Sequence, residues 1–157
     1  MSDKILINVL TLEKIERIIK NVKNNIVFLC LGNREVNFDC YASFVAKYLR
    51  KNKVKAYVYG GNKFPLYGKS LSDMSYMLNK VHKNDTIVFI DVVKTNEVSS
   101  DGNIVVSSKK YQVSNSDIVF NYDYSICYLV NISNKVDHYN KQKFAAKKIA
   151  TFISNYC

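Results

Sequence analysis

Two aspartates each follow a short apolar run that predicts a buried strand. The run at residues 26–31 breaks at Gly32 into a polar loop that ends on Asp39, and the run at residues 86–91 ends on Asp91. In right-handed β-α-β winding the ends of such strands usually become neighbours, and ligands bind in the crevice beyond them. The spacing therefore predicts two carboxylates at one crevice.

Two carboxylates in different surroundings can divide acid and base chemistry between them. Asp39 stands at the start of a predicted helix, where exposed N–H groups would favour its anion. Asp91 follows an apolar strand and could be held protonated by burial. The same pair could instead hold a divalent metal ion. Structural roles compete with both readings, with Asp39 as a helix cap and Asp91 as a polar strand end.

Cys40 offers a second kind of chemistry. A thiol at a helix N-terminus can have a depressed pKa and act as a nucleophile, but a cysteine protease also needs a histidine base. His82 lies near a predicted helix end and His138 just before a predicted helix, and we expect both at the surface. The sequence thus favours the carboxylates over the thiol.

The elements that position these residues follow from hydrophobic periodicity. Helices are predicted where apolar residues recur at intervals of three and four, and strands where short β-forming runs end at turn residues. Three helices cover residues 12–24 with Thr11 as cap, 41–51, and 71–81 opened by a capping box of Ser70 and Asp73. A closing helix begins just after His138, with Ala145, Ile149, Phe152, Ile153 and Tyr156 on its apolar face. The strands cover residues 26–31, 54–59 closed by Gly60 and Gly61, 86–91, 104–106, 118–120 and 125–130.

Strands that alternate with helices predict a three-layer α/β fold, with a mainly parallel twisted sheet flanked by helices. The insert at Asp101 and Gly102 suggests a small antiparallel edge. A chain of 157 residues with no linker, repeat or low-complexity stretch is expected to form one domain, residues 1–157.

Charge and cysteine content bound the cellular context. The net charge of +10 comes mainly from lysines spread along the chain, so we expect solvated lysines rather than a nucleic-acid surface, although a basic surface can attract polyanions. The four cysteines form no CxxC pair and are expected to be reduced. No apolar run approaches the roughly 20 residues that span a bilayer. These features predict a soluble cytoplasmic protein without membrane contact.

The loop around Asp39 resembles that of a known family. The segment Leu31-Gly-Asn-Arg-Glu-Val-Asn-Phe-Asp39 is similar to the Ile-Gly-Thr-Asp-Arg-Ser-Thr-Gly-Asp segment of the YyaC-type sporulation proteins, relatives of the germination protease and the hydrogenase maturation endopeptidases. Shorter likenesses at Val58-Tyr-Gly60 with Pro65, at Phe89-Ile-Asp91 and at Asp101-Gly-Asn-Ile-Val105 extend the resemblance over roughly residues 26–153.

This resemblance implies a phosphorylase/hydrolase-like α/β fold, a peptidase ancestry and a role in a spore-forming bacterium. It also puts Asp39 and Asp91 on the two acidic positions associated with the active site in that superfamily. The chain would be a divergent member, because Arg34 replaces an acidic residue of the loop and Phe38 replaces a glycine.

Further departures concern metal binding. In hydrogenase maturation enzymes a glutamate beside the aspartate and a later histidine help to bind nickel, and those places hold Cys40 and Ser125 here. A nickel site is therefore not expected. The additional site candidates are Asn33, Arg34, Glu35, Cys40, Gly61 and Ser125.

Three functional hypotheses follow. The first is a peptidase of the germination-protease type, in which Asp39 and Asp91 activate a water, or a metal-bound water, against a peptide bond. The second is a non-catalytic relative whose crevice binds a protein or peptide partner during sporulation. The third, and least favoured, is a basic nucleic-acid-binding protein. No cofactor is expected apart from a divalent metal ion under the first hypothesis.

Overall fold

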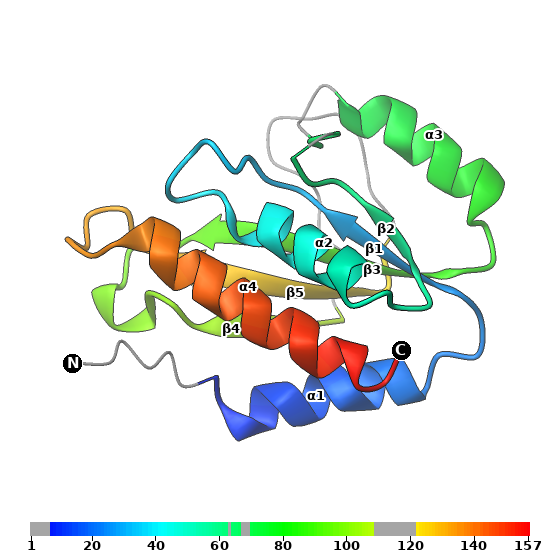
Figure 1. The fold of residues 1–157 in the computed structure, drawn as a ribbon, viewed down its shortest axis with the longest axis horizontal. Coiled ribbons are helices and arrows are strands. Elements are labelled where there is room, and N and C mark those ends of the chain that lie inside the picture. Colours follow the sequence, from blue (N-terminus) through cyan, green and yellow to red (C-terminus); the bar gives the residue numbers. More distant parts are fainter. Residues whose placement is uncertain (1–6, 63, 67–69, 109–121) are drawn as a thin grey trace.

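A computed structural model describes residues 7–62, 64–66, 70–108 and 122–157, which form a twisted five-stranded sheet with helices on both faces (Figure 1). The strand order is β2-β1-β3-β5-β4. Strands β1, β2, β3 and β5 run parallel, and β4 pairs antiparallel with β5 at one edge. The predicted three-layer α/β fold and its antiparallel edge are confirmed. The strands are β1 Ile26–Cys30, β2 Tyr57–Tyr59, β3 Thr86–Lys94, β4 Ile104–Ser107 and β5 Tyr124–Val130.

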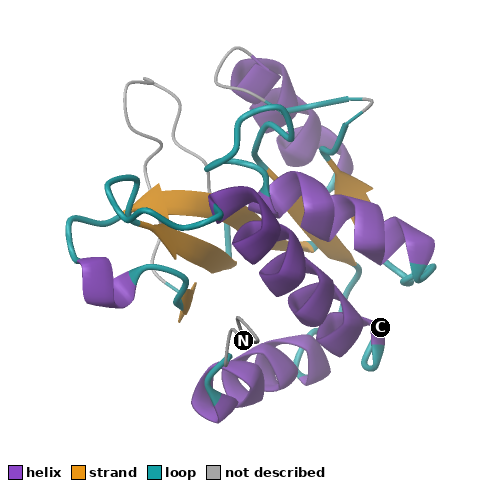
Figure 2. Ribbon diagram, turned by 60° about the vertical axis from the view of Figure 1, so that its left-hand side comes forward, coloured by secondary structure: helices purple, strands orange, loops and turns teal. Residues whose placement is uncertain are grey.

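The helices divide unequally between the two faces of the sheet, as Figures 1 and 2 show. Helices α1, α2 and α4 pack on one face in a large apolar cluster, and α3 packs on the other in a smaller one. They are α1 Val9–Lys20, α2 Tyr41–Lys51, α3 Leu71–Val81 and α4 His138–Ser154, with a short 3-10 turn, η2, at Val98–Ser100.

Side chains of β3 alternate between these two faces, as strand geometry requires. Val88 and Ile90 join the large cluster, whereas Ile87 and Phe89 join the cluster under α3. By the same alternation, Asp91 lies on the α3 face. The sheet therefore presents the acidic residue to its thinner side.

Some predicted boundaries are wrong. Strand β3 continues to Lys94, because its residues from Asp91 to Lys94 pair with β5, so Asp91 lies within a strand rather than at its end. The second strand begins at Tyr57 instead of residue 54. The closing helix, α4, begins at His138 itself, one residue from its predicted start. The strand predicted at residues 118–120 lies outside the described residues.

One predicted helix cap is wrong, and a second is correct in position but lacks the capping hydrogen bond. Asn8, not Thr11, caps α1, and its side chain accepts a hydrogen bond from Leu10. Ser70 does precede α3, but its side chain makes no capping hydrogen bond. Asn8 rather than Thr11 is the capping residue because the helix begins about one turn before the first residue of its apolar face.

The prediction that His82 lies at the surface is wrong. Its side chain is 1% exposed, with Nε2 2.6 Å from the hydroxyl of Tyr59 and Nδ1 2.7 Å from Oδ2 of Asp85. His138 is also mostly covered, and its Nε2 lies 2.8 Å from the carbonyl oxygen of Asn134. Neither histidine lies among the contacts of Asp39 or Asp91 described below.

No helix in the described ranges has both the length and the apolar character needed to cross a membrane.

Candidate functional site

The reversal of strand order places the loop after β1 beside β3. From β1 the chain crosses to β2 on one side, and the next strand, β3, pairs on the other side of β1. Cys30 pairs with Ile90, and the N–H of Leu31 donates to the carbonyl of Ile90 at 2.9 Å. The chain thus leaves β1 level with the position of Asp91, at the kind of switch point where α/β sheets bind ligands.

The loop at residues 32–39 folds back on itself and returns Asp39 to the end of β1. The N–H of Asn33 donates to the carbonyl of Asp39 at 2.8 Å, and the N–H of Asp39 donates to the carbonyl of Val36 at 2.9 Å. A Cβ on Gly32 would lie only 2.9 Å from the Asp39 carbonyl oxygen. A glycine is therefore needed for this close approach.

A side chain from the far end of the sequence fixes the other side of Asp39. The carboxamide oxygen of Gln142, on α4, accepts hydrogen bonds from the N–H groups of Cys40 and Tyr41 at 2.9 and 3.0 Å. Its nitrogen donates to the carbonyl of Phe38 at 2.8 Å. Gln142 is fully buried and satisfies amides at the start of α2, so Asp39 is not the cap of that helix.

The two aspartates interact and differ in acidity. Burial raises the pKa of Asp91 to about 8, against a hydrogen bond from the Val92 N–H that lowers it, and the charge of Asp39 raises it further. Burial raises the pKa of Asp39 to about 6, against the lowering effects of a backbone hydrogen bond from Asn33 and the charge of Lys94. Near neutral pH, Asp91 therefore holds a proton while Asp39 is largely ionised. This is the separation that acid and base roles require.

The pKa of Asp39 is thus raised, contrary to the expectation that a helix N-terminus would favour its anion. Asp39 precedes the capping position, which Cys40 occupies, and the first helix amides already donate to Gln142. Burial consequently outweighs the helix dipole at this carboxylate.

The depressed thiol pKa that a helix N-terminus can give is not found at Cys40. The residue is fully buried, and burial raises the pKa of its thiol to about 12, with a further raise from the charge of Asp39. Its sulfur lies 3.5 Å from the oxygen of Gln142 and 3.7 Å from the carbonyl oxygen of Asn37. Cys40 is a packing residue in this arrangement.

The register of β5 identifies the strand neighbours of Asp91. Asp91 pairs with Cys127, and Phe89 pairs with Ser125. Cys127 rather than Ser125 therefore lies opposite the carboxylate; burial and then the charge of Asp91 raise the pKa of its thiol to about 12. Ser125 is buried two residues back along the same strand. Only the pairing register, which the sequence does not reveal, distinguishes these two positions.

The remaining candidate site residues predicted from the sequence lie in different surroundings. Asn33 contacts Asp39, because its N–H donates to the Asp39 carbonyl, and its side-chain oxygen accepts from the N–H of Glu35. Glu35 itself is exposed. Arg34 turns toward α2, with its guanidinium 4.7 Å from the ring centre of Phe44. Gly61 follows β2 with a φ of +110°, packed against Arg50.

A depression of about 200 Å³ lies at the carboxyl ends of β3 and β5. Lys94, which acts on Asp39, lines it together with Thr95, Asn131 and Ser133. A larger pocket of about 310 Å³ lies at the opposite edge, and its described lining, which includes Lys14 and Arg17, contains no carboxylate, thiol or imidazole. The described linings of these two pockets do not include Asp39 or Asp91, and the smaller depression is linked to the aspartates through Lys94.

A metal ion bound by Asp39 and Asp91 would need further ligands from outside this pair. Within the described part of the chain, no group of three or more histidine, cysteine, aspartate or glutamate side chains is placed to hold a metal ion. Asp39 and Asp91 supply two carboxylates, so a divalent ion here would need water or substrate for most of its coordination sphere.

A comparison with solved structures finds a protein of similar fold. The fold is similar to the crystal structure of HycI, a [NiFe] hydrogenase maturation protease from Thermococcus kodakarensis KOD1, with 14% sequence identity and a TM-score of 0.55 over 89% of this chain and 98% of that one. At this identity the likeness concerns the fold. A search of curated proteins gave no match.

A family comparison covers nearly the whole sequence. Residues 3–155 match the family described as "Protein of unknown function (DUF1256)". The match includes every described helix and strand, together with the loop that carries Asp39. The chain therefore belongs to the DUF1256 family.

Proposed function

We propose that the protein is a peptidase in which Asp39 and Asp91 divide the base and acid roles at one peptide bond. The observation that carries the proposal is the pair of interacting aspartates with separated pKa values, about 6 and about 8, at the switch point of the sheet. The maturation-protease fold supports it.

The reaction follows from the two protonation states. The Asp39 carboxylate accepts a proton from a water molecule as its oxygen attacks the carbonyl carbon, while the protonated Asp91 donates to the carbonyl oxygen. When the C–N bond of the tetrahedral intermediate breaks, the proton held by Asp39 passes to the leaving nitrogen and Asp91 recovers its own. One water is consumed, and a carboxylic acid and an amine result.

The substrate under this proposal is a protein or a peptide that enters along the depression beside Lys94. The resemblance of the Asp39 loop to that of the YyaC-type proteins supports a role in the cytoplasm of a sporulating cell. A transcriptional reporter tests this association: expression should rise during sporulation, and expression confined to vegetative growth would contradict it.

A second candidate is a non-catalytic protein whose crevice binds a peptide partner. The observation that favours it is the substituted loop, because Phe38 brings a half-buried aromatic ring beside Asp39, where it lies 5.9 Å from Lys94 Nζ. Such a ring suits binding as well as catalysis.

The experiment that separates the two uses a mixture of synthetic peptides of diverse sequence, analysed by mass spectrometry with and without added divalent ions. The wild type should cleave a subset, and Asp39→Asn and Asp91→Asn should not. Glu35→Gln, an exposed charge change in the same loop, should behave as the wild type. Cleavage that survives both aspartate substitutions would eliminate the pair, and a wild type that binds peptides without cleaving them would favour the second candidate.

A further inference from the structure

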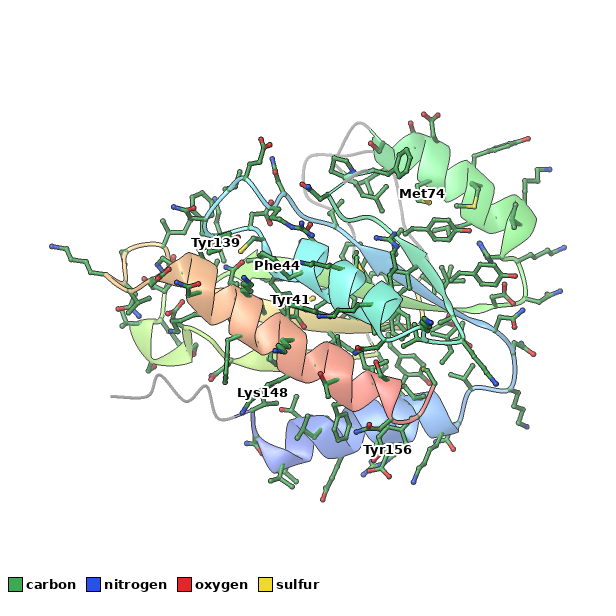
Figure 3. The ribbon with its side chains drawn as sticks, in the orientation of Figure 1. Tyr41, Phe44, Met74, Tyr139, Lys148 and Tyr156 are labelled. Atoms are coloured by element: carbon green, nitrogen blue, oxygen red, sulfur yellow. The ribbon has the colours of Figure 1, made fainter. Side chains whose placement is uncertain are left out.

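Three cations gather around one aromatic ring next to the candidate site. The ring of Phe44, on α2, lies 4.7 Å from the guanidinium carbon of Arg34, 5.5 Å from Nζ of Lys143 and 5.9 Å from Nζ of Lys47. Figure 3 shows Phe44 and Tyr139 between the starts of α2 and α4. The cations come from the Asp39 loop, α2 and α4, so folding brings them together.

A fourth cation extends this cluster to the carboxylates. Lys94, at the end of β3, lies 5.9 Å from the ring centre of Phe38, and its charge lowers the pKa of Asp39. It also lines the depression at the ends of β3 and β5. Arg34, Lys47, Lys94 and Lys143 together form what we call the basic rim.

The basic rim has no ion-pair partner within the chain as described. The ion pairs between described residues use other groups: Lys20 pairs with Glu16, and Lys141 pairs with Asp101. The remaining two pairs join His82 to Asp85 and His138 to Asp101. In addition, Nε of Arg34 is buried and makes no hydrogen bond to any described residue. Like charges repel when they are held together, so the folded chain leaves a local positive excess that an anion would relieve.

We propose that the basic rim binds an acidic segment of the protein substrate and so sets the substrate class. This inference rests on the peptidase function proposed above. An extended chain with carboxylate side chains could pair with Arg34 and the lysines on its way to the depression beside Lys94. Guanidinium and carboxylate groups match in geometry as well as in charge.

A peptide fits the basic rim better than a nucleic acid does. Nucleic-acid surfaces follow the backbone with many phosphate contacts, whereas the rim is compact and ends at Asp39, whose negative charge would repel a phosphate. A peptide can place its neutral scissile amide at Asp39 and keep its carboxylates over the rim.

The test measures binding separately from cleavage. A short fluorescein-labelled peptide of alternating Glu and Ala is titrated with the Asp39→Asn variant, and fluorescence anisotropy gives the dissociation constant. The peptide should bind, and its affinity should fall as the salt concentration is raised. It should also bind far more tightly than the matching peptide of alternating Gln and Ala. Binding without any cleavage by the wild type would remove the peptidase proposal, and with it the substrate role of the rim, while binding of an acidic peptide to the rim would still hold.

Matched charge reversals on α4 locate the binding surface. Lys143→Glu should weaken binding by about tenfold, because it reverses a rim charge. Lys148→Glu changes the net charge equally but lies further along α4, over Phe144, and should weaken binding by less than about twofold. Equal weakening by both variants would overturn the proposal.

Two further measurements test the proposal. Amide chemical shifts of the folded wild type, followed during peptide addition, should move at Arg34, Phe44 and Lys94. This measurement requires no substitution. Shifts confined to other surfaces would overturn the proposal. Tighter binding of single-stranded DNA than of the acidic peptide at physiological salt would also overturn it and would favour a nucleic-acid partner.

Discussion

The carboxamide oxygen of Gln142 lies 2.9 Å from the backbone nitrogen of Cys40, a residue 102 positions earlier in the chain. Because the nitrogen of the same side chain donates to the Phe38 carbonyl, one buried residue of α4 holds the backbone on both sides of Asp39. The position of the proposed base therefore depends on the docking of α4 against α2.

Replacing Gln142 by Leu should destabilise the protein by about 2–5 kcal/mol, since it leaves two buried N–H groups and one carbonyl without their partner. Urea unfolding followed by circular dichroism measures the change. Lys147→Leu, an exposed replacement on the same helix, should cost little by comparison. Equal losses in the two variants would show that the hydrogen bonds of Gln142 contribute nothing specific.

Stability should fall as the pH rises through the range set by Asp91. Its folded pKa of about 8 lies above the ordinary value of 3.8, so the folded state binds the proton more tightly than the unfolded state does. The resulting stabilisation is complete below about pH 4 and is lost progressively up to about pH 8. Asp39, with a folded pKa of about 6, acts in the same direction up to that pH.

Asp91→Asn should therefore raise the free energy of unfolding at pH 8 by about 1–3 kcal/mol, less than the full pKa shift would give because the residue is half-buried. Thermal melts between pH 5 and pH 8.5 measure the dependence for the wild type and the variant. Glu35→Gln serves as the control, because Glu35 is exposed, and its curve should follow the wild type. A wild-type curve that rises toward pH 8 would contradict the assignment.

The four cysteines should differ in their reactivity toward iodoacetamide in the folded protein. Cys30 and Cys40 are fully buried, and burial raises the pKa of each thiol to about 12. Cys127 and Cys157 are both half-buried, but burial and the charge of Asp91 raise the pKa of the Cys127 thiol to about 12, so Cys157 should be alkylated first. Peptide mapping by mass spectrometry gives the order. Rapid alkylation of Cys40 would restore it as a candidate nucleophile.

The buried His82 should stabilise the fold through both ring nitrogens. His82→Leu would leave the Tyr59 hydroxyl and the Asp85 carboxylate without their partner, at a cost of about 2–4 kcal/mol. Chemical denaturation provides the measurement, with Asn79→Leu as an exposed control on α3. A variant as stable as this control would show that the contacts contribute no net stability.

Local pattern was enough to predict most of the architecture. The range of α2, residues 41–51, was predicted correctly because its apolar face repeats at helical spacing and its ends are marked by polar residues. The parallel order followed from the alternation of strands and helices, and β4 from its position after the turn at Asp101 and Gly102. These features depend on neighbours in the sequence.

The features that could not be predicted from the sequence depend on contacts between residues far apart in the chain. Asp91 pairs with Cys127, so a segment that reads locally as a strand end is drawn into a longer strand. Gln142 reads as one polar residue in a lysine-rich helix, yet it is buried because α4 crosses the start of α2. His82 is likewise buried by Tyr59, a partner 23 residues earlier. Register and helix docking decide all three cases.

The unequal covering of the sheet has a consequence for its motions. The α3 face has the smaller apolar cluster, so α3 should detach in a subglobal opening of lower free energy than the unfolding of α2 or α4. Its amides should then exchange with deuterium before theirs. Because Asp91 lies on the same face as Phe89, such an opening would widen access to the carboxylate while the strands on either side of it stay paired.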